Sequence, residues 1–182
     1  IISMVCASTI WLWIFDPTAG VLNQTLRSLG LGTYDWLKDP NMAMGCVVFV
    51  SVWKNMGYCM LIYLSGLKGI PAYLYEAAEI DGARRMQRFW YITLPMLQPT
   101  TFFLFITSCI SSFNVFEQVN VLTNGGPLNT TTTIVHQIYL RGFTQFKMGY
   151  ASAMSVVLLL VVCLITLINF RFGNQGQDTD IG

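Results

Sequence analysis

Three apolar segments of membrane-spanning length constrain the fold of this chain most strongly. They run from Met42 to Leu67, from Met96 to Phe116 and from Gly149 to Phe170. A helix needs about 20 apolar residues to cross the hydrocarbon core of a bilayer. Because lipid offers no hydrogen-bond partner to free backbone groups, such segments must form helices. The sequence therefore predicts an all-α, polytopic transmembrane helical bundle.

The composition supports a membrane protein and argues against two other classes. The sequence is 54% hydrophobic and 10% charged, whereas soluble domains carry about 25% charged residues. Its formal net charge of +1 gives no sign of the concentrated basic patch that binds nucleic acid. The five cysteines are scattered singly, without metal-ligand or redox spacing. We therefore expect no nucleic-acid partner and no metal site.

A shorter apolar run, residues 1–15, opens the sequence. As a helix it would cover about 22 Å, less than the roughly 30 Å of the hydrocarbon core. It has neither the basic start nor the cleavage site of a secretion signal. We expect the second half of a spanning helix, and treat the chain as the C-terminal portion of a larger membrane protein. Residues 1–172 are predicted to form one transmembrane domain, followed by a polar tail, 173–182.

Two polar connections flank the first and third complete spans. Residues 16–40 include VLNQTLRSLGL, which predicts a short amphipathic helix at the membrane interface. Residues 117–147 include TNGGP, four consecutive threonines and an apolar-periodic piece that contains the only histidine, His136. With no second histidine or nearby cysteine, His136 has no partner for a metal set or a catalytic triad. We predict an ordinary surface or packing residue.

The most polar stretch, residues 68–95, lies between the first two complete spans. Its charged residues in the central part are Glu76, Glu79, Asp81, Arg84, Arg85 and Arg88. Pro71 suits a first helical position, and Gly82 can end a helix in a left-handed conformation. The pattern predicts two short helices with a hinge between them. Small residues on a short, exposed helix allow close approach by another protein, so the insert is a predicted docking surface.

The orientation of the spans follows from basic residues in short loops. The insert and the end of the third span carry Lys68, Arg84, Arg85, Arg88 and Arg171, whereas the two opposite connections carry Arg27, Lys38, Arg141 and Lys147. The bias is modest, but it predicts that the insert is cytoplasmic.

The insert closely resembles the EAA loop of the membrane subunits of binding-protein-dependent ABC importers. The family pattern is Glu-Ala-Ala, a glycine a few residues later, then Ile-x-Leu-Pro. It is matched without departure by Glu76, Ala77, Ala78, Gly82, Ile92, Leu94 and Pro95. IPAYLYEAAEIDGA, LTNGGP and GYASAMSVVLL are similar to stretches of the carbohydrate-type permeases, such as those for maltose, lactose and glycerol phosphate. The resemblance covers essentially the full length, and family members are longer.

The resemblance implies a multi-pass protein of the bacterial inner membrane whose insert is a coupling helix that docks in a cleft of an ATPase subunit. The residues it assigns to coupling are Glu76, Ala77, Ala78, Asp81, Gly82, Leu94 and Pro95. It further implies a second, homologous permease subunit, two cytoplasmic ATP-binding subunits and an external substrate-binding protein as partners. The sequence has no GxxxxGK[ST] loop. We therefore expect no enzyme activity and no cofactor in this chain, with ATP-Mg held by the ATP-binding subunits.

Candidate residues for the substrate pathway come from helical spacing. On the first complete span they are Ser51, Asn55 and Tyr58, and on the second they are Ser108, Ser111, Ser112 and Val115. Polar groups in a bilayer tend to face protein or a water-filled cavity. Hydroxyls, an amide and an aromatic ring would suit a sugar. Helix–helix packing is the alternative, because serine is also common at helix interfaces.

Lys54 lies near the middle of the first complete span. An intramembrane charge is by default a functional hypothesis, and an anionic substrate such as a sugar phosphate would suit it. The alternative is that Lys54 snorkels or bonds the carbonyls of a partner helix. A pair with Glu117 is not expected, because Lys54 lies about 18 Å below the end of its helix.

The sequence leaves several functions open. The leading prediction is a permease subunit that forms the pathway for a sugar or related carbohydrate. Alternatives are a permease for a non-sugar or anionic solute of the glycerol phosphate type, and an ATP-independent secondary transporter or channel. A membrane-embedded enzyme would need convergent catalytic groups in the bilayer, and the sequence offers only isolated Lys54 and Glu117.

Overall fold

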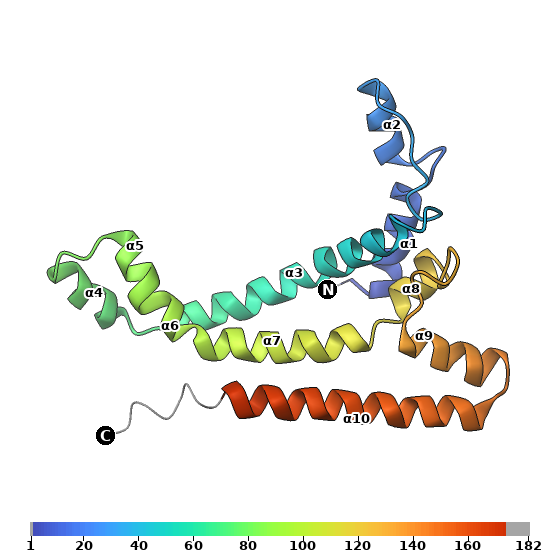
Figure 1. Ribbon diagram of the computed structural model, residues 1–182. Helices are drawn as coiled ribbons and strands as arrows, with labels where there is room; N and C mark the ends of the chain where they lie inside the picture. The colour runs from blue at the N-terminus through green and yellow to red at the C-terminus, as the bar shows by residue number, and fades with distance from the viewer. Residues whose placement is uncertain (1, 174–182) are drawn as a thin grey trace. The chain divides into compact units, whose positions relative to one another are not determined.

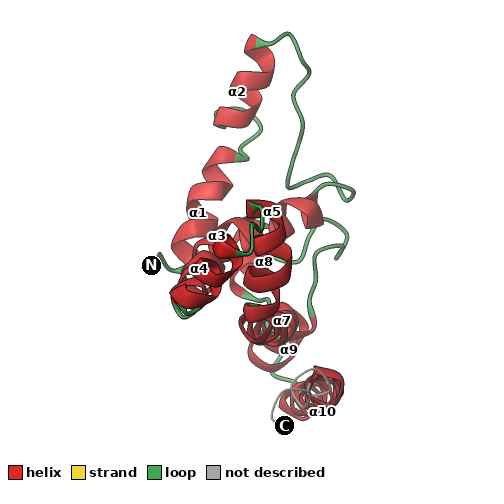
Figure 2. Ribbon diagram, turned by 90° about the vertical axis from the view of Figure 1, so that its left-hand side faces the viewer, coloured by secondary structure: helices red, strands yellow, loops and turns green. Residues whose placement is uncertain are grey.

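The computed structural model describes residues 2–173, and within them every regular element is a helix (Figures 1 and 2). The all-α prediction is therefore confirmed. The predicted polar tail lies outside the described residues, apart from Gly173. The described chain forms two compact units, a first unit of residues 2–54 and 110–165 and a second unit of residues 55–109 and 166–173. The single domain predicted for residues 1–172 stays a prediction.

Among the described residues, two helices are long and apolar enough to cross a membrane. They are α3 (Ala43–Lys68) and α10 (Met148–Gly173), of 26 residues each. Their bounds agree closely with the predicted spans 42–67 and 149–170, because an uninterrupted apolar run allows no other structure in lipid. The predicted partial helix at residues 1–15 corresponds to the shorter apolar helix α1 (Met4–Ile14).

The predicted span 96–116 differs from the structure at both ends. Its helix, α7 (Gln98–Phe113), has 16 residues and follows a 57° bend at Leu97. Before the bend lie α5 (Arg85–Arg88), the π-helical turn η1 (Phe89–Thr93) and α6 (Leu94–Met96). Membrane-spanning length is reached only if the bent pair counts as one span. At the far end the Asn114 side chain donates to the Ile110 carbonyl (3.1 Å), and the helix stops before Val115.

The core of the first unit is built by α1, the first half of α3 and α8 (Glu117–Leu122), with α1 packed against α8. Its buried members are Phe15, Cys46, Val47, Val50, Val119 and Leu122. Trp11 lies over this cluster, with ring centroids 5.0 Å from Phe49 and 5.4 Å from Trp53. Aromatic rings at these edge-on angles add attraction to their packing.

Asn23 holds the connection 16–40 together. It lies on α2 (Val21–Ser28), is fully buried, and has four hydrogen bonds. Its Nδ2 donates to the carbonyls of Pro17 (3.1 Å) and Tyr34 (2.9 Å). Its Oδ1 accepts from the Tyr34 N–H (3.2 Å) and the Trp36 Nε1–H (3.0 Å). An amide side chain has no further capacity, so α2 and residues 34–36 are fixed to each other by one residue.

The connection 117–147 is held by its threonines. Thr131 is fully buried, donates to the Gly126 carbonyl (2.8 Å) and lies 2.7 Å from the Thr123 hydroxyl. Thr133 donates to the Val115 carbonyl (2.6 Å) and accepts from the His136 N–H (3.3 Å), which caps α9 (Ile134–Tyr139). A π-helical turn, η2 (Leu140–Thr144), follows. Threonines of this run thus stabilise the connection through side-chain hydrogen bonds.

His136 is a packing residue, and the surface alternative is wrong. Its side chain is fully buried, and neither ring nitrogen has a hydrogen-bond partner within the described residues. Gly125 has a φ of +83°, and a Cβ at this glycine would lie 2.8 Å from His136 Cε1. Burial lowers the pKa of the His136 imidazole. The TNGGP turn therefore needs glycine at position 125 for its φ and for the ring beside it.

The second unit is closed by the approach of α3 to α7. A Cβ at Gly66 would lie 2.7 Å from Thr100 Oγ1 and 3.0 Å from Leu97 Cδ2. The Tyr63 hydroxyl donates to Thr101 Oγ1 (3.2 Å). Small residues allow such close packing of apolar helices. The end of α3 and the start of α7 are therefore tied together next to the polar stretch between them.

We predict that Asn23→Ala destabilises the first unit. The change leaves the Trp36 indole N–H and the Tyr34 backbone groups without their partner, at about 1–3 kcal/mol for each group that stays unsatisfied. Thermal unfolding of the detergent-solubilised protein should show a lower midpoint. Gln24→Ala is the matched control, because Gln24 is an exposed amide on the same helix with one hydrogen bond, to the Ala19 carbonyl. Equal midpoints for the two variants would contradict this role of Asn23.

The burial of His136 predicts a loss of stability in acid. Above the ordinary pKa of 6.5 the imidazole is neutral in the folded and the unfolded chain. As the pH falls below that value, the unfolded chain binds a proton that the folded chain resists, so the free energy of unfolding decreases until the lowered folded pKa is reached. His136→Leu should remove this contribution. Unfolding midpoints at pH 8 and pH 5 should therefore differ less for His136→Leu than for the unsubstituted protein, and an unchanged difference would contradict the prediction.

Candidate functional site

The polar stretch 68–95 folds as two helical arms joined at a glycine. The first arm is α4 (Ala72–Ile80). Pro71 was predicted to be its first helical residue, but it is the N-cap, and the helix begins at Ala72. Gly82 has a φ of +75°. Its N–H donates to the Glu79 carbonyl (3.1 Å), and the Ala83 N–H donates to the Ala78 carbonyl (2.9 Å). This pair of bonds is the Schellman motif that ends helices at glycine, so the predicted hinge is confirmed.

The second arm runs from Arg85 to Met96 without a break. Its start is capped by the Arg84 backbone N–H, which donates to Gln87 Oε1 (2.7 Å). Pro95 has no N–H to give and would clash with a carbonyl in a regular helix. The π-helical turn η1 lies immediately before it, where the Leu94 N–H donates to the Phe89 carbonyl. The wider turn lets the helix pass through Leu94-Pro95.

Two side-chain contacts fix the arms to each other. Arg88 Nη1 lies 3.0 Å from Glu79 Oε2, the one ion pair within the described residues. The Tyr75 hydroxyl lies 2.9 Å from the hydroxyl of Thr93, which is buried. An exposed ion pair contributes at most about 1 kcal/mol. The contacts therefore fix the geometry of the arms more than they stabilise the fold.

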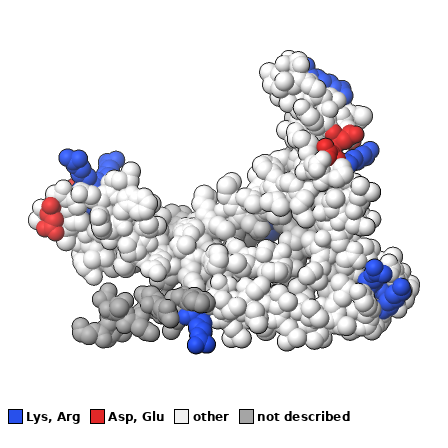
Figure 3. All heavy atoms as spheres, viewed as in Figure 1, with Lys and Arg blue, Asp and Glu red and all other residues white. Residues whose placement is uncertain are grey.

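The residues assigned to coupling lie mostly at the surface. Glu76, Ala77, Asp81, Gly82, Leu94 and Pro95 are exposed, and Ala78 is half-buried. No hydrogen bond or ion pair in the described chain holds the Glu76 carboxylate. Figure 3 shows charged side chains of the second unit gathered over α4 and α5. The surface thus combines small, acidic and basic residues.

Sequence reasoning missed the large apolar residues of this surface. Ile80 is 88% exposed and Tyr91 81% exposed, and Tyr73 and Met86 are also exposed. Isolated exposed apolar residues are ordinary, but several on one short hairpin mark a site of contact with another molecule. The signal in the sequence was Ile80 itself, an isoleucine between Glu79 and Asp81. It becomes significant only once α4 is seen to lack a covering element within the described residues.

The structure places the predicted pathway residues of α3 in two settings. Ser51 is half-buried in the first unit, where it donates to the Val47 carbonyl (2.8 Å) and accepts from Gln118 Nε2 (3.0 Å). This contact fits the packing alternative for Ser51. Asn55 and Tyr58 belong to the second unit and are exposed. Their part in a substrate pathway stays a prediction.

The predicted face of α7 is corrected at one position. Ser108, Ser111 and Ser112 lie on the helix and are exposed. Val115 lies beyond the last helical residue and is packed against the core of the first unit. It does not share the face of the serines, because the Asn114 amide bonds back to the Ile110 carbonyl at the helix end.

Lys54 is half-buried on α3, and within the described residues it forms no ion pair with Glu117 or any other acid. Residues 2–173 also contain no group of three or more His, Cys, Asp or Glu side chains that could hold a metal ion. The half-buried position of Lys54 fits both of its alternatives.

Comparisons with known proteins show which family the chain belongs to. The profile of the family described as "Binding-protein-dependent transport system inner membrane component" matches residues 1–175. The chain is 42% identical over 167 residues to the sn-glycerol-3-phosphate transport system permease protein UgpA of Brucella abortus biovar 1 (strain 9-941), covering 91% of the chain and 57% of that relative. It is 36% identical over 180 residues to the probable ABC transporter permease protein YurN of Bacillus subtilis (strain 168), covering 98% and 62%.

A solved structure is similar along the whole chain. It is a bacterial alginate ABC transporter in complex with an alginate pentasaccharide-bound periplasmic protein, with a TM-score of 0.89, 27% identity, and coverage of 100% of this chain and 63% of that one. The chain thus spans a little less than two thirds of the relatives it matches. On the match of the family profile and of these permeases, the chain belongs to the family of inner membrane components of binding-protein-dependent transport systems.

Proposed function

We propose that the chain is the major part of a permease subunit of an ATP-driven importer, and that the hairpin of α4 and the second arm receives the motion of an ATPase. The observation that carries the proposal is the exposed hairpin surface in a member of this family: Ile80 is 88% exposed, and the Glu76 carboxylate has no hydrogen bond or ion pair within the described residues. An apolar side chain and an unpaired acid on a short helix suit docking into a cleft with an apolar floor and a basic group.

The contacts within the hairpin would allow it to transmit movement of the ATPase to the membrane helices. The Schellman turn at Gly82, the pair Arg88–Glu79 and the contact Tyr75–Thr93 hold its two arms as one body. The second arm continues through the bend at Leu97 into α7. Near this bend, the lack of a side chain at Gly66 lets α3 lie close to Thr100 of α7. Movement of the hairpin would therefore shift α3 and α7 together.

The chain would work as one member of a larger assembly. Its sequence has no GxxxxGK[ST] loop, which supports ATP-Mg binding by two cytoplasmic ATP-binding subunits and a transport role without enzyme activity in this chain. Basic residues in and beside the hairpin support its cytoplasmic orientation. A second permease subunit and an external binding protein complete the assembly, as the periplasmic protein in the similar alginate transporter suggests.

The substrate class we propose is a carbohydrate or a derivative of one. The similar proteins carry the names of an sn-glycerol-3-phosphate transport system and of an importer of the acidic polysaccharide alginate. Both of those solutes are anionic. Together with the half-buried Lys54 on α3, this favours an anionic carbohydrate as a second candidate beside a neutral sugar. Transport assays in which the two kinds of solute compete would separate them.

We predict that Ile80→Asp uncouples the permease from its ATPase. Ile80 touches little of its own chain, so the change should leave folding and membrane insertion intact, while placing a charge where an apolar contact is needed. Co-purification of the ATP-binding subunits and transport into cells should both fall by about tenfold or more, the loss of roughly 1.4 kcal/mol of binding free energy or more. Leu128→Asp is the matched control, because Leu128 is 86% exposed in the opposite connection.

If Ile80→Asp retained full co-purification and transport, the docking role of the hairpin would be excluded. If the unsubstituted protein transported solute with no ATPase bound, an ATP-independent transporter would replace the importer.

We also predict that Gly82→Val impairs coupling whereas Gly82→Asn largely preserves it. A φ of +75° is strained for a β-branched residue, at about 1–2 kcal/mol, while asparagine tolerates it. A Cβ at Gly82 meets no atom within 4 Å, so size alone should have no effect. The measurement is transport per assembled complex, and equal activity of the two variants would argue against a need for this turn.

A further inference from the structure

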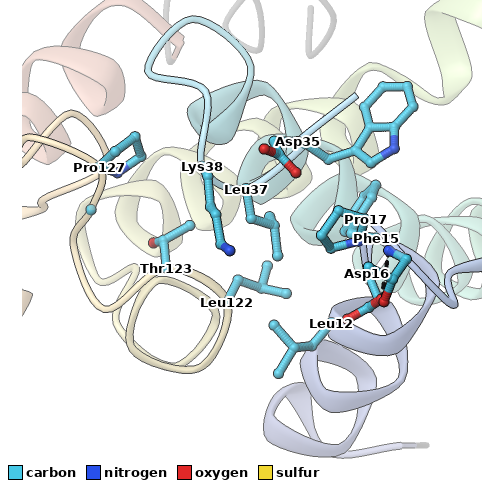
Figure 4. A pocket seen from close by; sticks show the side chains of 13 residues that line it. Leu12, Phe15, Asp16, Pro17, Asp35, Leu37, Lys38, Leu122, Thr123 and Pro127 are labelled. Carbon is cyan, nitrogen blue, oxygen red and sulfur yellow. Dashed lines mark hydrogen bonds between the residues drawn. The ribbon is translucent and has the colours of Figure 1, made fainter. Parts of the chain in front are cut away.

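The first unit contains an open pocket between its two connections. It has a volume of about 670 Å³ and is lined by residues from the end of α1, from positions 35–38, from α8 and from the TNGGP turn (Figure 4). Its floor is apolar, with Leu12, Phe15, Leu37 and Leu122. Phe15 and Leu122 belong to the buried core of the unit. The floor is therefore a fixed part of the fold.

The walls of the pocket are held without any occupant. Asn23 fixes Pro17 and Trp36 on one side, and the Thr123–Thr131 contact fixes the TNGGP turn on the other. Asp16 Oδ1 accepts from the Thr18 N–H (2.8 Å), the Thr18 hydroxyl (2.7 Å) and the Ala19 N–H (2.7 Å). When the residues of a site are already ordered, binding loses little free energy to ordering them.

The charges on the rim are not equivalent. The three hydrogen bonds to Asp16, of which the Ala19 bond has the largest effect, hold the pKa of its carboxyl below the ordinary value. The charge of Lys38 adds the smallest contribution to this lowering, and the Lys38 ammonium has no ion pair or hydrogen bond within residues 2–173. Figure 4 shows its side chain reaching over the floor beside Leu122 and Thr123, with Asp35 at the rim. The pocket thus offers an apolar floor under a cation that has no ion pair within the described residues, with the carboxylates of Asp16 and Asp35 also in the lining.

The order of the elements along the chain bears on the side of the membrane to which the two connections belong. The connection 16–40 leads into the start of α3, and the connection 117–147 joins the end of α7 to the start of α10, whereas the hairpin joins the end of α3 to the start of α7. If α3 and α7 each cross the membrane once, both connections lie on the external side.

We infer that this pocket receives a segment of the substrate-binding protein in which a carboxylate stands beside an apolar side chain. The inference rests on the proposed importer function, which supplies a protein partner on that side. The apolar side chain would lie on the floor of Leu12, Leu37 and Leu122, and the carboxylate would pair with Lys38. The pair lies at a solvent-exposed rim, so it would act on association and be weakened by salt.

The test uses the complete transporter in proteoliposomes, with ATP hydrolysis measured against the concentration of its substrate-loaded binding protein. Lys38→Glu should raise the half-saturating concentration at least fivefold, with the basal and the maximal rates unchanged. Lys38→Met, which keeps the apolar stem, should give a smaller increase. The ratio between the Lys38→Glu and unsubstituted proteins should shrink as the salt concentration rises. Arg27→Glu is the matched control, because Arg27 is an exposed base in the same connection but not a pocket residue.

The outcomes separate this inference from the proposed function. If no binding protein stimulates hydrolysis by the unsubstituted transporter, the importer function itself fails. If stimulation occurs but Lys38→Glu leaves the curve unchanged, or changes only the maximal rate, the pocket is not the docking site. An equal increase for Arg27→Glu would also overturn the inference, because it would show a general charge attraction across the connection.

Discussion

The need to satisfy backbone hydrogen bonds away from water determines most of this structure. Inside the apolar segments the helix meets that need alone, as in α3 and α10. Where the helices stop, side chains or backbone turns supply the remaining hydrogen bonds. Asn23 closes one connection with four hydrogen bonds, the threonines close the other, and the Schellman turn at Gly82 closes the hairpin.

The hairpin of α4 and the second arm shows how a helix can accommodate one proline. Pro95 would interrupt a regular helix, yet the π-helical turn before it preserves the helix from Arg85 to Met96, and the axis bends only after it, by 57° at Leu97. The Leu-Pro pair thus joins the hairpin to α7 through a continuous helical arm and a single bend. A flexible loop at this point would absorb any movement of the hairpin before it reached α7.

Each of the two proposed contact surfaces combines residues held by contacts within the fold with a charged group that has no ion pair among the described residues. In the hairpin, Ile80 and Glu76 stand on arms fixed by Arg88–Glu79 and Tyr75–Thr93. In the first unit, Lys38 stands over a floor formed by core residues. Each surface is complete within its own compact unit, so the two proposals can be tested separately. The apolar floor and the large exposed side chains supply contact area, and the unpaired charges supply selectivity.

The sequence by itself determined the helical class, two of the three spans to within a few residues, and the Gly82 hinge, because apolar run length, proline and glycine act locally. The EAA pattern also identified the family. The tertiary structure alone decided the burial of His136 beside Gly125, the bond between Ser51 and Gln118, and the pocket beneath Lys38. Each depends on which distant residues meet, and residues such as Ser51 and Gln118 are 67 positions apart. Periodicity along one segment carries no information about such meetings, since it reports only which side of a helix a residue occupies.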